Sequence, residues 1–203
     1  NAVIALSDEA KKLAADRHLV VRQTLNDKQI SEQPLSENGV TKTLTGDVRL
    51  WDIESPTLYQ MTTELVADGE VVDSDVTMIG FRNAVFKKDG FYLNGRNVKL
   101  RGLNRHQSYP YVGYAMPESM QRHDARILKR ELGLNAVRTS HYPQSHYFID
   151  ECDRLGLLVF TEIPGWQHIG GTRWKKIAVR NVREMVLQYR NHPSIILWGT
   201  RIN

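Results

Sequence analysis

The same joint occurs twice in the second half of this 203-residue chain, and it constrains the fold more than any other feature. A helix-like segment ends in Leu-Gly-Leu and an apolar, strand-like segment follows, at Leu132-Gly133-Leu134 and again at Leu155-Gly156-Leu157. A glycine directly after a helix is typical of a left-handed capping residue. Helices that alternate with short apolar strands predict a parallel sheet with right-handed crossovers. The two candidate folds are an open doubly wound sheet and a (β/α) barrel.

The apolar periodicity gives the positions of the elements in this second half. It predicts helices over residues 119–132, 144–155 and 173–191, and strands over residues 98–103, 134–139, 157–162 and 194–198. No Gly-x-Gly-x-x-Gly follows the first strand, which argues against a dinucleotide-binding sheet. A complete barrel takes about 250 residues, roughly twice the length of residues 87–203. We therefore predict the first four units of a (β/α)8 TIM barrel, truncated after the fourth strand.

The first 86 residues have the pattern of short β-strands. Alternating apolar residues predict strands over residues 18–25, 58–66 and 70–79. The polar stretch 26–38 is predicted to be a loop. Short strands with turns about every ten residues are typical of a β-sandwich. We therefore expect two domains, a partial β-sandwich over residues 1–86 and the barrel half over residues 87–203.

Composition and charge narrow the function classes. The formal net charge is +4, and the densest basic set is best explained as the solvated face of the last helix, so we expect no nucleic-acid partner. No run of about 18 apolar residues is present, so we expect no membrane-spanning helix. Cys152 is the single cysteine, which excludes an internal disulfide and is predicted to be a small core residue. The basic set comprises Lys175, Lys176, Arg180, Arg183 and Arg190.

In barrels, the reactive side chains lie at the carboxyl ends of the strands and in the loops that follow. Here that rule selects arginine, histidine, aromatic and amide groups, which suit a sugar because amides and imidazoles bind hydroxyls and aromatic rings stack on a pyranose. Arg138 directly follows an apolar strand, so it must point into the barrel mouth or pair with an acid, because burying its charge alone is costly. The selected residues are Asn104, Arg105, His106, Arg138, Ser140, His141, Tyr142, Glu162, Pro164, Trp166, His168, Arg201 and Asn203.

The same residues also fit two roles that involve no sugar. A single histidine or arginine at a strand end is more often a local hydrogen-bond partner than a functional group. His106 and His141 could also bind a metal, but the chain has no His-Glu-x-x-His or Cys/His ligand spacing. We therefore expect no metal and no other cofactor.

Three long motifs carry a resemblance to a known family. They are Leu100-Arg101-Gly102-Leu103-Asn104-Arg105-His106, Leu134-Asn135-Ala136-Val137-Arg138-Thr139-Ser140-His141-Tyr142-Pro143 and Arg190-Asn191-His192-Pro193-Ser194-Ile195-Ile196-Leu197-Trp198-Gly199, with Leu50-Trp51 and Ile79-Gly80-Phe81-Arg82 upstream. In this order they resemble the domain junction, the second barrel strand and the approach to the fourth strand in glycoside hydrolase family 2. The resemblance covers roughly residues 40 to 203, and it implies an immunoglobulin-like sandwich followed by a TIM barrel.

The resemblance also implies an activity and site residues. It implies a retaining exo-β-glycosidase, and a β-galactosidase is the expectation here. His106, His141 and Asn203 match substrate-binding residues, and Arg138 matches the arginine that orients the nucleophile. Glu162 matches an acidic position of less defined role.

Two further positions concern a possible metal site. Some β-galactosidases of the family bind Mg²⁺ through a carboxylate and a histidine after the third strand. Trp166 stands at the carboxylate position and His168 at the histidine position, so that site is not expected here.

The resemblance further implies that the acid/base glutamate follows Asn203 directly and that the nucleophile lies several strands later. We therefore expect this chain alone to be inactive, and a non-catalytic carbohydrate-binding or scaffold module is the alternative. A half-barrel leaves two sheet edges open, so we expect the chain to form a homo-oligomer. One cysteine does not fix the compartment, and the bacterial cytoplasm and periplasm both fit the parent protein.

Overall fold

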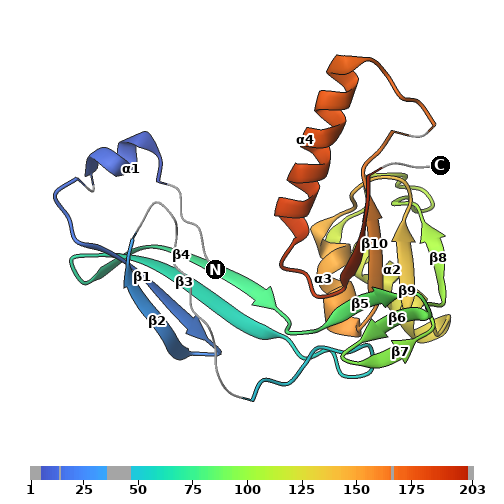
Figure 1. The fold of residues 1–203 in the computed structure, drawn as a ribbon, viewed down its shortest axis with the longest axis horizontal. Coiled ribbons are helices and arrows are strands. Elements are labelled where there is room, and N and C mark those ends of the chain that lie inside the picture. Colours follow the sequence, from blue (N-terminus) through green and yellow to red (C-terminus); the bar gives the residue numbers. More distant parts are fainter. Residues whose placement is uncertain (1–5, 14, 36–46, 166, 201–203) are drawn as a thin grey trace. The chain divides into compact units, whose positions relative to one another are not determined.

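A computed structural model describes residues 6–13, 15–35, 47–165 and 167–200 (Figure 1). Their contacts form two compact units. Unit 1 contains the described residues of 1–48 and 59–79, and unit 2 contains those of 49–58 and 80–203. The segments 49–58 and 80–86, on the sandwich side of the boundary expected at residue 86, thus belong to the same compact unit as the barrel strands.

Unit 1 is built on one antiparallel sheet of four strands in the order β2-β1-β3-β4. The short helix α1 (Asp8–Leu13) precedes β1 (Leu19–Leu25), β2 (Lys28–Pro34), β3 (Tyr59–Ala67) and β4 (Glu70–Ile79). Among the described residues of this unit, the buried apolar side chains are Val21, Val66 and Ala67. The three strands expected from alternation are confirmed, because β1, β3 and β4 coincide with them.

The loop predicted over residues 26–38 is wrong for most of its length. Lys28–Pro34 forms β2, which pairs with β1. Asn26 and Asp27 join the two strands with positive φ angles of 46° and 65°, as in the two-residue turns that suit twisted hairpins. The strand escaped detection because it lies at the sheet edge, where polar side chains reach water. Residues 36–38 lie outside the described part of the chain.

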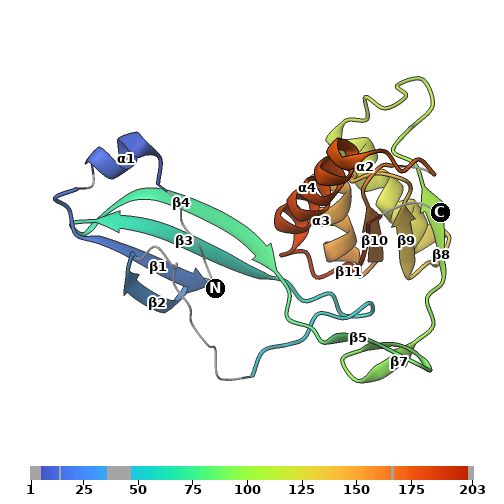
Figure 2. The same cartoon turned by 45° about the horizontal axis from the view of Figure 1, so that its top comes forward.

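Unit 2 contains a parallel sheet with the strand order β11-β10-β9-β8 (Figures 1 and 2). Its strands are β8 (Gly102–Arg105), β9 (Ala136–Thr139), β10 (Leu158–Glu162) and β11 (Ile195–Gly199). The helices between them are α2 (Glu118–Arg126), which continues as the π-helical turn η1 (Ile127–Glu131), α3 (His146–Leu155) and α4 (Thr172–Tyr189). Gly133 and Gly156 end two of these helices with φ of 63° and 69°, which confirms the predicted left-handed caps.

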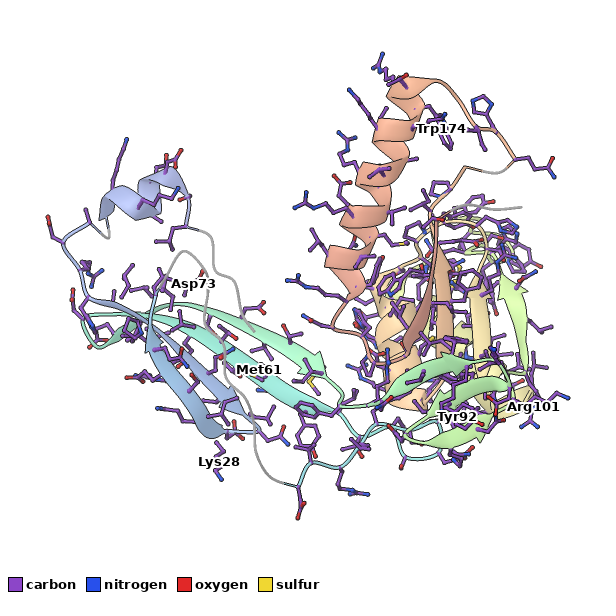
Figure 3. The ribbon with its side chains drawn as sticks, viewed as in Figure 1. Lys28, Met61, Asp73, Tyr92, Arg101 and Trp174 are labelled. Atoms are coloured by element: carbon purple, nitrogen blue, oxygen red, sulfur yellow. The ribbon has the colours of Figure 1, made fainter. Side chains whose placement is uncertain are left out.

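A small antiparallel sheet precedes the barrel strands. It consists of β5 (Ala84–Lys87), β6 (Gly90–Leu93) and β7 (Arg96–Val98), with Tyr92 on its central strand (Figure 3). The prediction of one strand over residues 98–103 is wrong, because Val98 ends β7 and the first barrel strand begins only at Gly102. A side chain at Gly102 would come within 2.3 Å of the Ala136 carbonyl oxygen, so β8 approaches β9 closely there.

Two apolar clusters cover the two faces of the parallel sheet. On one face, strand residues such as Val137 and Val159 pack with Phe148 of α3 and Met185 of α4. On the other face, at the amino ends of the strands, Leu158 packs with residues of the small sheet and with Trp51. This second cluster, called the lower cluster below, closes the bottom of the half-barrel and leaves the carboxyl ends of the strands open.

The segment that leads into unit 2 is fixed to the start of β11. Arg82 donates from Nε to the Pro193 carbonyl and from Nη2 to the Ile195 carbonyl, the latter at 2.5 Å. Burial lowers the pKa of Arg82. A Cβ atom at Gly80 would lie 2.7 Å from Pro193 Cγ, so only glycine allows this approach. Two of the motifs that carry the family resemblance therefore meet here and stabilise the unit.

A buried acid links the helix layer to the same motif. Asp153 Oδ2 lies 2.6 Å from His192 Nδ1, and Asp153 Oδ1 accepts a hydrogen bond from the Ser194 N–H at 3.0 Å. The indole N–H of Trp51 donates to the Asp153 carbonyl at 2.7 Å. Asp153 thus connects α3, the start of β11 and the segment before the small sheet.

Three expectations from composition concern single residues or helices. Cys152 is fully buried in the helix-side cluster, as expected, and burial raises the pKa of its thiol. The five basic residues of the densest set are exposed on α4 and just after it. No helix in the described part of the chain combines the length and the apolar sequence needed to cross a bilayer.

Candidate active site

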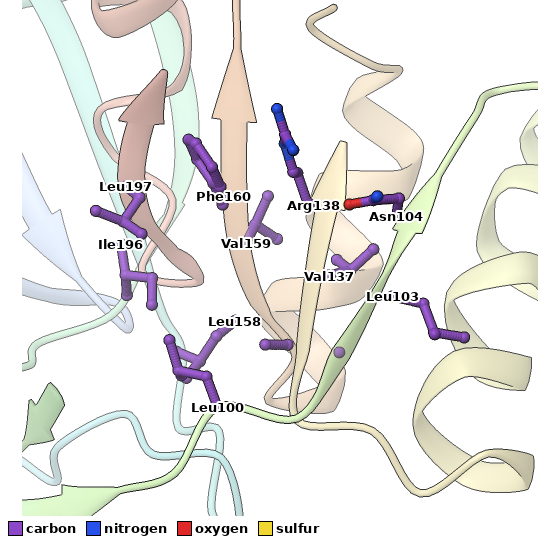
Figure 4. A pocket seen from close by; sticks show the side chains of 12 residues that line it. Leu100, Leu103, Asn104, Val137, Arg138, Leu158, Val159, Phe160, Ile196 and Leu197 are labelled. Carbon is purple, nitrogen blue, oxygen red and sulfur yellow. The ribbon is translucent and has the colours of Figure 1, made fainter. Parts of the chain in front are cut away.

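The carboxyl ends of the parallel strands carry polar side chains on the face that the helices do not cover. Cα register pairs Arg138 of β9 with Asn104 of β8 and with Phe160 of β10. Because successive side chains alternate between the faces of a strand, Arg138 and Glu162 lie on the same face as Phe160. Figure 4 shows Arg138 between Phe160 and Asn104.

Glu162 is the centre of this group of side chains. It is fully buried, and its Oε2 accepts hydrogen bonds from Nε and Nη2 of Arg138 at 3.1 and 2.9 Å. Its Oε1 lies 2.7 Å from Nδ1 of His141. Arg138 thus pairs with an acid, which is one of the two arrangements that the sequence allowed. Its guanidinium also lies 5.3 Å from the centre of the Phe160 ring, a cation–π distance.

The structure brings the two predicted histidines together. The rings of His106 and His141 meet edge to face with centroids 5.4 Å apart, and the Tyr142 ring lies 6.1 Å from that of His106. The Tyr142 hydroxyl accepts a hydrogen bond from the Gln107 N–H at 3.0 Å. His106 is exposed and His141 is half-buried, so the imidazole pair borders the open end of the half-barrel.

Arg105, which the sequence placed among the candidates, is directed away from this group. Its guanidinium is buried and bonds Asp124, Gln144 and Gln121, and it lies 3.9 Å from the centre of the Phe148 ring. Gln144 was not among the candidates, yet its Nε2 donates to the carbonyl of Arg105 at 2.7 Å. Arg105 therefore organises the interior between β8, α2 and α3. Nothing in the sequence indicated this interior role, because the residues that flank Arg105 would look the same beside a buried arginine and beside an exposed one.

A pocket of about 350 Å³ lies on the open face of the sheet below Arg138. Its wall is mostly apolar and comes from all four strands, as Figure 4 shows. In a closed barrel this face is the interior and is filled by side chains. The pocket is therefore the unfilled core of a half-barrel, and the polar group at its upper end is the candidate site. Residues that line the pocket include Leu100, Leu158, Phe160, Ile196 and Leu197.

The remaining candidates lie elsewhere or outside the described residues. Trp166 and Asn203 are not described. His168 is exposed, and its ring meets that of Trp174 edge to face at 5.8 Å. Trp174 lies on α4 (Figure 3). The expectation that no Mg²⁺ binds at these two positions stays a prediction.

One group of metal-type ligands does occur among the described residues. Asp150, Asp153 and His192 bring their ligand atoms within 4.8 Å of one another on the helix side of the sheet. His192 Nδ1 and Asp153 already form a close ion pair. Burial alone would lower the pKa of His192, but the hydrogen bond and charge of Asp153, together with Asp150, outweigh it and raise the pKa. The group is explained by this ion pair.

Comparison with known proteins identifies the family. A family model described as "Glycosyl hydrolases family 2, TIM barrel domain" matches residues 84–201, and a second, "Glycosyl hydrolases family 2", matches residues 4–82. The first match alone spans more than half of the chain. The chain therefore belongs to glycoside hydrolase family 2, and its fold is part of the family's sandwich domain followed by part of its TIM barrel.

Curated relatives agree with this assignment. The chain is 62% identical over 157 residues to a β-galactosidase of Thermoanaerobacterium thermosulfurigenes, a match that covers 77% of the chain and 22% of that protein. It is 53% identical over 177 residues to a β-galactosidase of Thermoanaerobacter pseudethanolicus, covering 87% of the chain and 23% of that protein. The chain thus spans less than a quarter of the length of these relatives.

Two solved structures have a similar fold. β-Glucuronidase 3 of Bacteroides uniformis superposes with a TM-score of 0.78 at 36% identity, over 91% of this chain and 24% of that one. A β-galacturonidase of this family from Eisenbergiella tayi, bound to galacturonate, superposes with a TM-score of 0.82 at 30% identity, over 92% of this chain and 35% of that one. The neighbours thus act on more than one sugar.

Proposed function

We propose that the protein to which this chain belongs is a retaining exo-β-glycosidase, most specifically a β-galactosidase. The observation that supports this best is the convergence of Arg138, His141 and Glu162 at the carboxyl ends of β9 and β10, in a chain 62% identical to a β-galactosidase. Cationic and imidazole donors at this position suit the hydroxyl groups of a terminal sugar. In this proposal His106, His141 and Asn203 bind the sugar, and Arg138 orients the nucleophile.

The test is a panel of nitrophenyl glycosides with the full-length protein. We expect the β-galactoside to be hydrolysed with the highest kcat/KM among the β-galactoside, β-glucuronide, β-galacturonide and β-mannoside. Preference for a uronide would contradict the galactosidase proposal while keeping the glycosidase. Absence of turnover for every sugar, together with a residue other than glutamate after Asn203 in the parent gene, would favour a scaffold module.

We also propose that the chain of 203 residues is inactive by itself. Retaining hydrolysis needs two carboxylates about 5–5.5 Å apart, one as acid/base and one as nucleophile. At the described rim, Glu162 is the buried carboxylate, and both of its oxygens are already bonded to Arg138 and His141. Turnover of a nitrophenyl galactoside by the purified chain, with host β-galactosidase removed, would contradict this proposal.

A further proposal is that the isolated chain associates with itself through the half-barrel. β8 and β11 are the outer strands of the described parallel sheet, and outer strands present unpaired backbone groups. Leu100 and Leu103 are 36% and 53% exposed at the β8 side. We expect light scattering at micromolar concentration to show a dimer or larger species, and the double variant Leu100→Lys/Leu103→Lys to weaken it. A stable 23.3 kDa monomer that binds no apolar dye would contradict the proposal.

A further inference from the structure

We propose that Glu162 is a positioning residue of the sugar site, an inference that rests on the proposed glycosidase function. In this role the carboxylate does not react. It fixes the guanidinium of Arg138 and the imidazole of His141 relative to each other, so that Arg138 meets the nucleophile and His141 meets the sugar in one arrangement.

The hydrogen bonds of Glu162 provide the first argument. Three nitrogen atoms from two side chains converge on one carboxylate: Nε and Nη2 of Arg138 at 3.1 and 2.9 Å, and Nδ1 of His141 at 2.7 Å. Glu162 is fully buried, whereas the side chains of Arg138 and His141 are 31% and 18% exposed. The buried group is therefore the anchor, and the two partly exposed groups are the ones that can reach a ligand.

The positions of the three residues along the chain explain why such an anchor matters. Arg138 lies near the end of β9 and His141 lies in the loop that follows, while Glu162 ends the neighbouring strand β10. A loop residue has more conformational freedom than a strand residue. The contact with Glu162 joins the loop position of His141 to the rigid end of β10 and thereby reduces that freedom.

The neighbouring strand leaves space for Glu162 because it has a glycine at the facing position. Register places Gly199 of β11 opposite Glu162. A Cβ atom at Gly199 would come within 2.5 Å of Glu162 Cβ and 2.9 Å of Phe160 Cε2. The absence of a side chain at Gly199 thus allows Glu162 to keep the position from which its carboxylate bonds Arg138.

Replacing the carboxylate by an amide should disturb both partners. Glutamine has one acceptor oxygen and an NH₂ group that donates, so it cannot accept from all three nitrogen atoms that meet Glu162. It also leaves the Arg138 charge without its counter-ion. Arg138 and His141 then lose their common anchor while both remain in the chain.

The experiment compares two buried glutamates in the full-length protein. Glu162→Gln is expected to lower kcat/KM for the best nitrophenyl glycoside about 10- to 100-fold, with the larger part in kcat, because displacement of catalytic-site groups by about 1 Å can cost about 10²-fold. The matched control is Glu151→Gln. Glu151 is also buried and pairs with Arg122 and Arg126 at 3.3 and 2.7 Å, but between α2 and α3. This control is expected to lower thermal stability while kcat and KM stay within about twofold of wild type.

A second variant tests placement without removing charge. Gly199→Ala keeps the carboxylate but pushes against Glu162, and it is expected to lower kcat as Glu162→Gln does, with a smaller change in KM. If Glu162→Gln does not fold, Gly199→Ala still tests the inference. The inference is overturned if the wild type is active and either Glu162→Gln or Gly199→Ala behaves kinetically like Glu151→Gln. An inactive wild-type protein overturns the proposed function instead, so the two failures are distinguishable.

Discussion

The two units each contain a four-stranded sheet, but they bury these sheets to different extents. In unit 1, seven of the ten residues of β4 are exposed in succession, including Val71, Val72 and Val76. In unit 2, four of the five residues of β10 are buried, because helices cover one face and the small sheet covers the lower part of the other. Parallel sheets require such cover on both faces, whereas antiparallel sheets tolerate one open face. Stability that depends on packing should therefore be concentrated in unit 2.

The largest effect is expected from Trp51→Ala. Trp51 is fully buried in the lower cluster, and its indole N–H bonds the Asp153 carbonyl. Loss of the ring should cost about 3–5 kcal/mol of unfolding free energy in unit 2. Hydrogen exchange should accelerate in β10 peptides and not in β3 peptides. The control, Trp174→Ala, removes a half-buried tryptophan outside both clusters and should cost about 1 kcal/mol. Equal acceleration in β3 would show that the units unfold together.

The next effect comes from a matched pair of glycines in unit 2. Gly133 and Gly156 have nearly the same φ, 63° and 69°, so alanine at either position costs about 1–2 kcal/mol for the left-handed conformation. At Gly156 the new Cβ would also lie 2.4 Å from the Ile53 carbonyl oxygen, whereas at Gly133 no atom lies within 4 Å. We expect Gly156→Ala to be more destabilising than Gly133→Ala by about 1–3 kcal/mol in denaturant titration. Equal losses would mean that the 49–58 segment is not packed tightly.

A smaller effect concerns pH. The pKa of His192 is raised in the folded state, because the hydrogen bond and charge of Asp153 outweigh the opposing effect of burial. A raised folded pKa means that the stabilisation is complete below the unfolded value of about 6.5 and is lost as pH rises through the folded value. Unit 2 should therefore lose stability as pH rises above about 6.5 and through the folded pKa of His192. His192→Gln should flatten that part of the curve, measured by unfolding at several pH values. An unchanged slope in the variant would assign the dependence to other groups.

The smallest effect is expected from Val76→Ala in unit 1. Val76 is 56% exposed on β4, so truncation should change the unfolding free energy by less than about 0.5 kcal/mol. Leu158→Ala in unit 2, a fully buried position on β10, is the contrast and should cost about 2–5 kcal/mol. A loss at Val76 as large as that at Leu158 would show that the open face of β4 is covered in solution, and the contrast between the units would then fail.

The sequence predicted most of the elements because their signals are local. Leu-Gly-Leu joints marked the helix ends, and apolar runs marked β9, β10 and β11 to within about two residues. Two predictions were wrong for physical reasons. β2 is polar because it lies at an edge, and β7 and β8 were merged because the link at residues 99–101 is held by the Asn135 side chain, a contact that comes from another element.

The site was predicted in part. The rule that barrels place reactive groups at strand ends selected Arg138, His141 and Glu162, and the structure brings these three together. The same rule selected Arg105, which lies in the interior, and His168, which lies against Trp174. The functional roles of His106, His141, Asn203 and Arg138 stay predictions for the full-length protein.

The amino-acid sequence by itself determined the alternation of helices and strands, the helix caps and the family motifs, because periodicity and glycine chemistry act over a few neighbouring residues. Only the tertiary structure decided which charged groups meet. The pairing of Glu162 with Arg138 joins residues 24 positions apart, and Arg82 reaches Pro193 across 111 positions. The first contact depends on strand register and on the space left at Gly199, and the second depends on the close approach that Gly80 allows. None of these quantities is encoded in the local pattern around any one of these residues.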